Sequence, residues 1–213
     1  LTKKHEIILV DDGSTDNSYA KMCTLHSFDS RVKIIRLKKN YGQQNAIMCG
    51  LHYALGDFIV IMDDDIQNPP EEIENLFLKI IEGYDLVYGI PDRKYYNFYR
   101  FLGSQMRDFL FNIMLNKPKS IKVSSFRIMS RNLAQEIIKD KTSFVYISAI
   151  TFKKKVKVAN ISVAHAKREY GGSNYSFVKL IKLFLNIFVN YSPLLSGFAD
   201  KLHPQFEIAD IKQ

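Results

Sequence analysis

Short apolar runs alternate with segments of helical periodicity over the first ninety residues of the chain. The runs are rich in β-branched residues and are followed by turn or cap residues, which is typical of buried strands. Strands that alternate with helices at this pitch predict a parallel, doubly wound sheet. The expected strands are Glu6–Val10, Val32–Leu37, Phe58–Met62 and Asp85–Ile90, and the expected helices are Asp16–His26, Gly42–Leu55 and a third that ends near Glu82.

The pattern becomes less regular after Pro91. Helical periodicity returns at Phe98–Leu115, where phenylalanines and leucines cluster at helical spacing. Beyond it, short apolar stretches again alternate with periodic ones. The further expected elements are a short strand at Ser124–Ser130, helices at Leu133–Lys139 and Phe144–Phe152, and a strand or pair of strands at Val156–Ala166.

The segment Ser176–Val189 is the most amphipathic of the chain. Two interpretations fit it: a helix packed on the core or on a partner, and a helix in a membrane interface with its lysines toward lipid phosphates. The apolar arc is wide, which favours the membrane. The narrow polar stripe consists of Lys179, Lys182, Asn186 and Asn190. The polar segment from Ser196 onward carries no assignment.

The composition is that of a basic chain with enough apolar residues for a sizeable core. Its 213 residues carry a net charge of +8 with a pI near 9.3, which favours nucleic acid, an anionic membrane surface or a phosphorylated substrate as partner. Cys23 and Cys49 lack metal-binding spacing and are expected to be reduced core residues. No apolar stretch reaches the roughly 20 residues of a transmembrane helix. The chain opens at Leu1 without a signal peptide, which is consistent with a fragment of a longer protein.

Three consecutive carboxylates, from Asp63 to Asp65, follow the third expected strand. Asn68 can cap a helix behind them, with a proline at its first position and Glu71 at its third. The acids then lie at the carboxyl end of a strand, where open α/β sheets bind ligands. Adjacent acids repel one another, and a cation relieves that repulsion. The oxygen ligands of Asp63, Asp65 and Gln67 suit Mg²⁺ or Mn²⁺ bound to a phosphate.

A second acidic cluster, Asp11 and Asp12, follows the first expected strand. The usual explanation of one such cluster is a solvated loop with capping Asp residues. In a parallel sheet, however, both clusters lie at the same edge and point into one crevice. One cluster can then bind a base or ribose through hydrogen bonds, and the other a metal and a diphosphate.

Five stretches in this order resemble family 2 glycosyltransferases of the GT-A fold. The Gln and Pro-Pro-Glu after the acids are similar to the polyprenyl-phosphate branch, which includes dolichol-phosphate mannose synthase and bacterial undecaprenyl-phosphate sugar transferases. The resemblance implies an α/β fold with a mostly parallel sheet flanked by helices. It also implies a first strand that is missing here, because the chain starts just before the family's second strand. The matching stretches are Val10–Asp16, Asn40–Gln43, Met62–Glu71, Arg168–Ser176 and, more weakly, Ser124–Arg131.

The resemblance further implies roles for the matching residues. Asp65 and Arg168 would be catalytic. The residues implied at the nucleotide are Asp11, Asp12, Gly13, Ser14, Gly42, Gln43 and Asp64. The implied metal ligands are Asp63, Asp65 and Gln67, and the residues implied at donor or acceptor phosphates are Arg93, Arg100, Arg127, Arg168 and Ser173. Asn174 departs from the branch, which usually has Lys at that position.

The acidic clusters and the resemblance together predict a metal-dependent transfer of a sugar from a UDP- or GDP-linked donor to a polyprenyl phosphate, with undecaprenyl phosphate as the first choice. The resemblance implies that the transfer inverts the anomeric carbon. The metal and the arginines stabilise the departing diphosphate. A lipid phosphate has a second pKa of about 6 and is mostly ionised, so it needs little or no general base. The predicted location is the cytoplasmic face of the bacterial inner membrane, with an anionic membrane surface and no nucleic acid as partner.

The expected organisation is a GT-A catalytic domain at residues 1–170, an amphipathic juxtamembrane helix at 171–195 and an unassigned tail at 196–213. A homo-oligomer is compatible with it. One alternative is a soluble family 2 transferase that acts on a glycan hydroxyl and needs a carboxylate base. Another is a non-catalytic nucleotide-binding or membrane-docking remnant, which the missing first strand supports. A phosphatase of the haloacid dehalogenase type is disfavoured, because Gln67 stands where that class has Thr.

Overall fold

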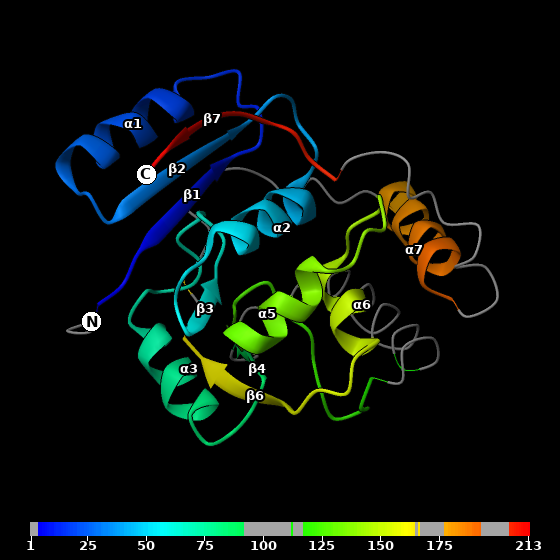
Figure 1. Ribbon diagram of the computed structural model, residues 1–213. Coiled ribbons are helices and arrows are strands. Elements are labelled where there is room, and N and C mark those ends of the chain that lie inside the picture. Colours follow the sequence, from blue (N-terminus) through cyan, green and yellow to red (C-terminus); the bar gives the residue numbers. More distant parts are fainter. Residues whose placement is uncertain (1–3, 92–111, 113–116, 165, 167–176, 193–204) are drawn as a thin grey trace.

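The strands of the described residues form two sheets with no ladder between them (Figure 1). This computed structural model describes residues 4–91, 112, 117–164, 166, 177–192 and 205–213. The smaller sheet has the strand order β1–β2–β7, and the larger one has the order β3–β5–β4–β6.

The smaller sheet is built around β2 (Val32–Leu37), which has a neighbour on each side. β1 (Ile7–Asp11) runs parallel to it and is connected to it by helix α1 (Ser18–Phe28). β7 (Ile208–Lys212) runs antiparallel along the other edge. Helix α2 (Gln43–Tyr53) follows β2 and packs against β1. This β–α–β–α order is the one that the apolar pattern predicts.

The larger sheet is mixed. It contains β3 (Phe58–Ile61), β5 (Arg127–Ser130), β4 (Leu86–Pro91) and β6 (Val158–Val163). β4 and β6 are parallel, but β5 lies between β3 and β4 and is antiparallel to both. Three of the four strands, β3, β4 and β6, therefore run in the same direction, so the sheet is mostly parallel as expected, and β5 is its one antiparallel strand. An apolar run does not reveal strand direction, because side chains alternate between the two faces in either orientation.

Helices cover both faces of the larger sheet. Helix α3 (Glu72–Ile80) packs on one face against Val87, whereas α5 (Arg131–Ile138) and α6 (Ile147–Phe152) pack on the other face, where Tyr88 is buried. Successive residues of β4 thus enter different clusters, and the strand is buried on both sides. This burial explains its continuous apolar run.

The four strands expected before residue 92 are confirmed to within one residue at each end. The expected cap of α3 is wrong. The helix begins at Glu72, its N-cap is Glu71 without a side-chain hydrogen bond, and Asn68 is buried instead. The carbonyl of Pro69 accepts a hydrogen bond from the amide of Glu72 (3.1 Å). The two prolines therefore form a turn of their own, and the helix starts only after it.

Helix α7 (Phe177–Tyr191) confirms the helix expected at 176–189. Ile187 and Tyr191 are buried in the core, so one face packs on the protein. Another side of the helix exposes three large apolar side chains, Leu185 (59%), Phe188 (41%) and Val189 (40%). Within the described residues, no helix has the length and apolar character needed to cross a bilayer. The helix expected at 98–115 lies outside the described residues, apart from Asn112.

Residues 205–212, in the segment that has no assignment from sequence, connect the two halves of the molecule. The side-chain amide of Gln205 donates to the carbonyls of Asp140 and Thr142, at 2.8 and 3.0 Å. The ring of Phe206 packs edge-on against His52 of α2, with ring centroids 5.6 Å apart. The chain then continues as β7 along β2 (red in Figure 1). This segment therefore contacts both the α5–α6 region and the smaller sheet.

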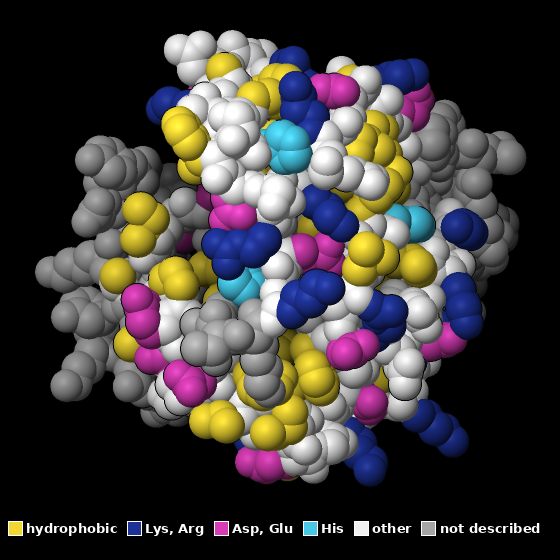
Figure 2. Space-filling view, turned by 60° about the vertical axis from the view of Figure 1, so that its left-hand side comes forward, with side chains coloured by type: hydrophobic (Ala, Val, Ile, Leu, Met, Phe, Trp, Pro, Cys, Tyr) yellow, Lys and Arg dark blue, Asp and Glu magenta, His cyan; other side chains and the backbone are white. Residues whose placement is uncertain are grey.

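Charged side chains of both signs are interspersed on the face shown in Figure 2. Lysine and arginine side chains alternate there with acidic and apolar ones among the residues drawn in colour. An extended basic patch is the electrostatic signature of nucleic-acid binding. The net charge of +8 is therefore not gathered into such a patch on the described part of this face.

Candidate functional site

Asp11 ends β1 and is almost completely buried, at 1% exposure. Its register partner on β2 is Arg36, whose Nε lies 3.2 Å from the Asp11 Oδ2. The amide of Ser14 donates to the other oxygen of Asp11 at 3.1 Å. A buried carboxylate needs such partners to offset the loss of its hydration. Asp11 is therefore fixed at the base of the β1–α1 loop by Arg36 and Ser14.

Asp12 joins the loops that follow β1 and β2. Its two carboxylate oxygens accept hydrogen bonds from the amides of Tyr41 and Gly42, at 2.7 and 2.8 Å. The loops also touch at Gly13, where an added Cβ would lie 2.6 Å from the carbonyl carbon of Lys39. Gly13 has a φ of +70°, a conformation that favours glycine. The Asp-Asp-Gly sequence thus holds two loops together at the edge of the smaller sheet.

Asp63 connects this edge to the second acidic cluster. Its Oδ1 accepts a hydrogen bond from the Gln43 side-chain amide, and its Oδ2 accepts one from the Ser125 hydroxyl, both at 2.6 Å. Gln43 opens α2 directly after Gly42, which Asp12 holds. The two acidic clusters therefore meet at the first turn of α2. A carboxylate has about four acceptor sites, so Asp63 can still bind a cation while it keeps both hydrogen bonds.

The loop after Asp63 turns sharply at Ile66. This residue has a φ of +60°, and its side chain is 65% exposed. A β-branched residue is rarely found in the left-handed region, and such strain is characteristic of functional loops. The turn brings the amide of Gln67 within 3.2 Å of the Asp65 Oδ1. Among the described residues, no three His, Cys, Asp or Glu side chains come together as metal ligands. A cation here would therefore depend on the mixed set of Asp63, Asp65 and the Gln67 amide oxygen.

Arg127 begins β5 opposite Ile61, two residues before Asp63. Its side chain is buried, at 3% exposure, and one terminal nitrogen donates to the Ser148 hydroxyl at 3.0 Å. The Tyr88 hydroxyl donates to the same Ser148 oxygen at 3.3 Å. The Arg127 Nε has no hydrogen-bond partner, and no carboxylate pairs with the Arg127 guanidinium among the described residues. A buried cation in this state is expected to attract an anion.

The other residues expected at the phosphates, Arg93, Arg100, Arg168 and Ser173, lie outside the described residues. The last described residue before Arg168 is Ala166. The amide of Ala166 donates to the backbone carbonyl of Gln67 at 2.9 Å. Ala166, two residues before Arg168, therefore lies directly beside the loop of Asp65 and Gln67.

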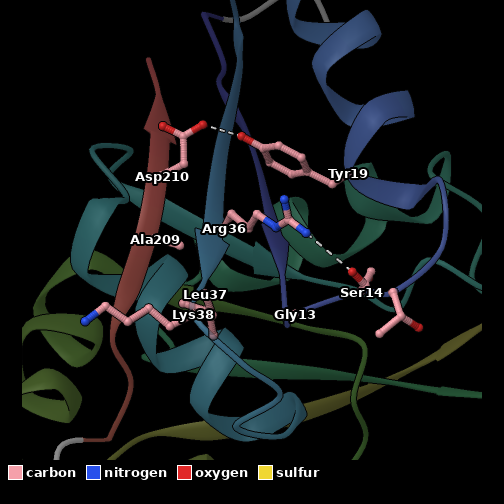
Figure 3. A pocket seen from close by; sticks show the side chains of 9 residues that line it. Gly13, Ser14, Tyr19, Arg36, Leu37, Lys38, Ala209 and Asp210 are labelled. Atoms are coloured by element: carbon pink, nitrogen blue, oxygen red, sulfur yellow. Dashed lines mark hydrogen bonds between the residues drawn. The ribbon is translucent and has the colours of Figure 1, made fainter.

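A cavity of about 460 Å³ opens beside the β1–α1 loop (Figure 3). The Gly13–Thr15 turn, Tyr19 of α1, Arg36 of β2 and Asp210 of β7 contribute to its wall. The Arg36 guanidinium carbon lies 4.4 Å from the centroid of the Tyr19 ring, and the Tyr19 hydroxyl donates to the Asp210 carboxylate. The predicted nucleotide residues of this loop thus share the cavity wall with side chains from three different elements.

Four residues of this region were missed by the sequence reasoning: Ser125, Arg36, Tyr19 and Asp210. A signal existed for Ser125, which belongs to a matching stretch, and for Arg36, a basic residue in a strand next to an acidic cluster. No local signal existed for Tyr19 and Asp210, because they are 191 positions apart in the sequence and meet only in the fold.

Comparison with known proteins identifies the family. Residues 2–138 match the family model described as Glycosyl transferase family 2. The chain belongs to this family. It is 40% identical over 195 residues to the undecaprenyl-phosphate 4-deoxy-4-formamido-L-arabinose transferase of Proteus mirabilis (strain HI4320), an alignment that covers 88% of this chain and 58% of the relative. A protein of the same name from Klebsiella pneumoniae (strain ATCC 700721 / MGH 78578) is 36% identical over 191 residues with the same coverage. The expected resemblance to the polyprenyl-phosphate branch is confirmed, and the chain spans little more than half the length of these relatives.

Solved structures confirm the GT-A-like fold of this family 2 chain. A crystal structure of glucosyl-3-phosphoglycerate synthase from Mycobacterium tuberculosis, in complex with Mn²⁺, UDP and glucosyl-3-phosphoglycerate, matches with a TM-score of 0.61 at 17% identity. The match covers 90% of this chain and 68% of that one. The crystal structure of a mycobacterial protein matches with a TM-score of 0.63 at 16% identity, covering 90% and 64% of the two chains. At these identities the likeness concerns the fold alone.

Proposed function

We propose that this family 2 protein transfers a sugar from a nucleotide-linked donor to a polyprenyl phosphate, with undecaprenyl phosphate as the first choice, and inverts the anomeric carbon. The observation that carries the proposal is the 40% identity, over 88% of the chain, to a transferase named for undecaprenyl phosphate. The meeting of both acidic clusters at the first turn of α2 supports a single site for nucleotide and diphosphate.

A divalent metal fits the loop that carries Asp63, Asp65 and Gln67, which is called the acid loop below. The carboxylates of Asp63 and Asp65 and the amide oxygen of Gln67 are hard ligands that suit Mg²⁺ or Mn²⁺. Asp63 is already held from two sides, by Gln43 and Ser125, so little side-chain freedom is lost when it binds an ion. A bound ion would act as a Lewis acid on the departing diphosphate. The presence of Mn²⁺ with UDP in a protein of similar fold supports this assignment.

The nucleotide end of the site is assigned to the two loops that Asp12 joins. These loops would present Gly13, Ser14, Gly42 and Gln43 to the nucleoside, with the buried Asp11 behind them, and Asp64 lies on the exposed side of the acid loop. A UDP-linked donor is favoured over a GDP-linked one, because UDP occupies a related protein of the same fold.

Arg127 is proposed to bind the phosphate of the lipid acceptor. Its guanidinium is buried without an anionic partner among the described residues, and a phosphate would supply one through charge-assisted hydrogen bonds. An ionised phosphate can attack the anomeric carbon directly, so the site needs little or no general base. Arg93, Arg100 and Ser173 are assigned to the same donor and acceptor phosphates from their motifs.

Arg168 is proposed to act with Asp65 in catalysis. Its support is the hydrogen bond from Ala166, two residues earlier, to the backbone of Gln67, because this contact keeps Ala166 beside the acid loop. An arginine placed there would stabilise the negative charge that develops on the leaving diphosphate.

The exposed apolar arc of α7 is proposed to rest on the cytoplasmic face of the bacterial inner membrane. Leu185, Phe188 and Val189 are exposed together, and Lys182 is exposed one turn earlier. An anionic lipid surface would cover the apolar side chains and attract the lysine. Vesicle flotation tests this role: the protein should bind vesicles of phosphatidylglycerol in a salt-sensitive way, and Leu185→Ser with Phe188→Ser should abolish the binding. Unchanged flotation of that variant would remove α7 from the membrane contact.

The experiment for the activity is a donor and acceptor panel. The full chain is incubated with UDP- and GDP-linked sugars, Mn²⁺ or Mg²⁺, and either undecaprenyl phosphate or an oligosaccharide acceptor. A glycolipid should form only with metal and lipid phosphate. Asp65→Asn should abolish it, whereas Asp57→Asn, at a carboxylate that is 91% exposed and remote from the acid loop, should not. Product on the oligosaccharide alone would establish the soluble glycan transferase, and no product with any pair would contradict the proposed activity.

Arg127→Met separates acceptor binding from donor binding. Replacing a buried, unpaired charge with an apolar side chain is often neutral or stabilising, so the variant is expected to fold. It should retain metal-dependent UDP binding but lose glycolipid formation. Ser148→Ala is the matched control, because it removes the hydroxyl partner of Arg127 and leaves its charge in place. Full transfer by Arg127→Met would contradict the acceptor role.

A further inference from the structure

The side chain of Asp210 enters the cavity beside the β1–α1 loop from a strand at the far end of the sequence. β7 pairs with β2, with Ile35 opposite Ile211 and Arg36 opposite Asp210. Asp210 accepts a hydrogen bond from the hydroxyl of Tyr19 on α1. β7, which contains none of the family motifs, is thus hydrogen-bonded to α1, the helix that follows the first acidic cluster.

The contacts continue from Tyr19 to the buried acid of that cluster. The Arg36 guanidinium lies 4.4 Å from the centroid of the Tyr19 ring, a distance at which cation–π attraction is effective. The same guanidinium forms the ion pair with Asp11 at 3.2 Å, and one of its terminal nitrogens donates to the carbonyl of Ser14 at 3.5 Å. Four side chains from three strands and a helix therefore form one continuous chain of contacts.

The charges along this chain alternate in sign. Asp210 is negative, Arg36 is positive and Asp11 is negative, and the neutral Tyr19 lies between the first two. The hydrogen bond between Tyr19 and Asp210 raises the pKa of the phenol and lowers that of the carboxyl, so both groups keep these states over the neutral range. The arrangement is therefore stable in its protonation and is suited to hold geometry rather than to transfer a proton.

We propose that β7 is a positioning element of the nucleotide site: Asp210 orients Tyr19, Tyr19 orients Arg36, and Arg36 fixes Asp11 and the β1–α1 loop against the nucleoside. This inference rests on the proposed function for its ligand, a nucleoside diphosphate. It gives a role to a segment outside all the motifs that the chain shares with its family.

The test compares three variants of the full chain with a matched control. Asp210→Asn removes the charged acceptor, and Tyr19→Phe removes the donor but keeps the ring over Arg36. The third variant combines both changes. Glu207→Gln is the control, because Glu207 lies in the same segment and also forms a carboxylate ion pair, with Lys38, away from Arg36. Calorimetry with UDP and Mn²⁺ measures affinity, and hydrogen exchange without nucleotide measures the protection of residues 11–17.

Each single variant should weaken UDP binding roughly threefold to tenfold and raise the exchange of the β1–α1 loop. The double variant should bind UDP with about the affinity of the single variant that binds less tightly, because both changes break the same contact. In turnover assays the KM for the donor should rise, and kcat should stay within about twofold. The control should match the wild-type protein in both measurements.

The outcomes separate this inference from the proposed function. Wild-type affinity and wild-type loop exchange in Asp210→Asn and Tyr19→Phe would overturn the positioning role and leave the proposed function intact. A second outcome is that the wild-type chain does not bind UDP while the β1–α1 loop exchanges faster in the variants than in the wild type. This outcome would overturn the UDP donor and support the positioning role. Additive losses in the double variant would show that the two residues act independently, which also overturns the inference.

Discussion

Ser125 holds one oxygen of Asp63, and its removal should weaken metal-dependent nucleotide binding. Ser125→Ala deletes the 2.6 Å hydrogen bond to Oδ2 and leaves the 2.6 Å bond from Gln43 to Oδ1. A hydrogen bond to an ionised group contributes roughly 1.5–3 kcal/mol, and the partial exposure of this pair places it at the low end of that range. A loss of about 1.4 kcal/mol corresponds to a tenfold change in affinity. We therefore expect Ser125→Ala to bind UDP with Mn²⁺ about tenfold more weakly than the wild-type chain.

Titration calorimetry with and without Mn²⁺ measures this effect. Ser124→Ala is the matched control, because among the described residues the neighbouring hydroxyl accepts a hydrogen bond from the amide of Phe126, at 3.3 Å, and none from the acid loop. The weakening should appear only when Mn²⁺ is present, since Asp63 is proposed to act through the metal. Equal affinities of the two alanine variants, or an equal loss without metal, would refute the idea that Ser125 orients a metal ligand.

Further predictions concern stability and thiol chemistry. Gly13→Ala should lower the free energy of unfolding by roughly 2–4 kcal/mol, because the φ of Gly13 is +70° and the new Cβ would lie 2.6 Å from a backbone atom. Gly83 has a φ of +97° but open space around it, so Gly83→Ala should lower the free energy of unfolding by only about 1–2 kcal/mol. Urea titration distinguishes the two variants. Burial raises the pKa of the Cys49 thiol from 9.0 to about 12, so this thiol should resist alkylation at pH 8 while the half-buried Cys23 reacts, as mass spectrometry can show. The stability that the raised pKa of Cys49 contributes is present below pH 9 and should be lost as the pH rises from 9 to about 12, and urea unfolding of Cys49→Ala should lack that loss. Tyr191→Phe should cost roughly 1–3 kcal/mol in thermal unfolding, because the Tyr191 hydroxyl accepts a backbone amide at 3.0 Å and donates to a backbone carbonyl at 2.6 Å, both in the α5–α6 loop.

The candidate site was predicted from sequence in its positions but not in its contacts. Asp11, Asp12 and Asp63 were expected at one edge, and the structure brings Asp12 and Asp63 together at the first turn of α2. The sequence suggested that Asp12 faces a nucleoside, whereas in the structure both of its oxygens hold backbone amides of the next loop. Arg127 was expected at a phosphate, and its burial without a carboxylate partner among the described residues could not be inferred from its motif. Side-chain partners depend on distances across the fold, which local spacing does not contain.

The two cysteines show the same limit. Both fall in segments with a helical pattern and were expected in the core. Cys49 is buried, but Cys23 is only half-buried, because α1 has no buried residue and lies on the outer side of the smaller sheet. A helical pattern predicts the helix, but which of its faces is covered depends on the neighbouring elements.

The sequence by itself determined the four strands before residue 92, the acidic loops and the family. These features are local: a strand is recognised by its apolar run and the turn that follows, and a motif by residues within about ten positions of one another. Only the tertiary structure decided that β5 is antiparallel, that Ser125 clamps Asp63, and that β7 pairs with β2 and meets Tyr19. These contacts join residues far apart in the chain, and they form because burial and hydrogen bonding select among arrangements that the same local pattern allows.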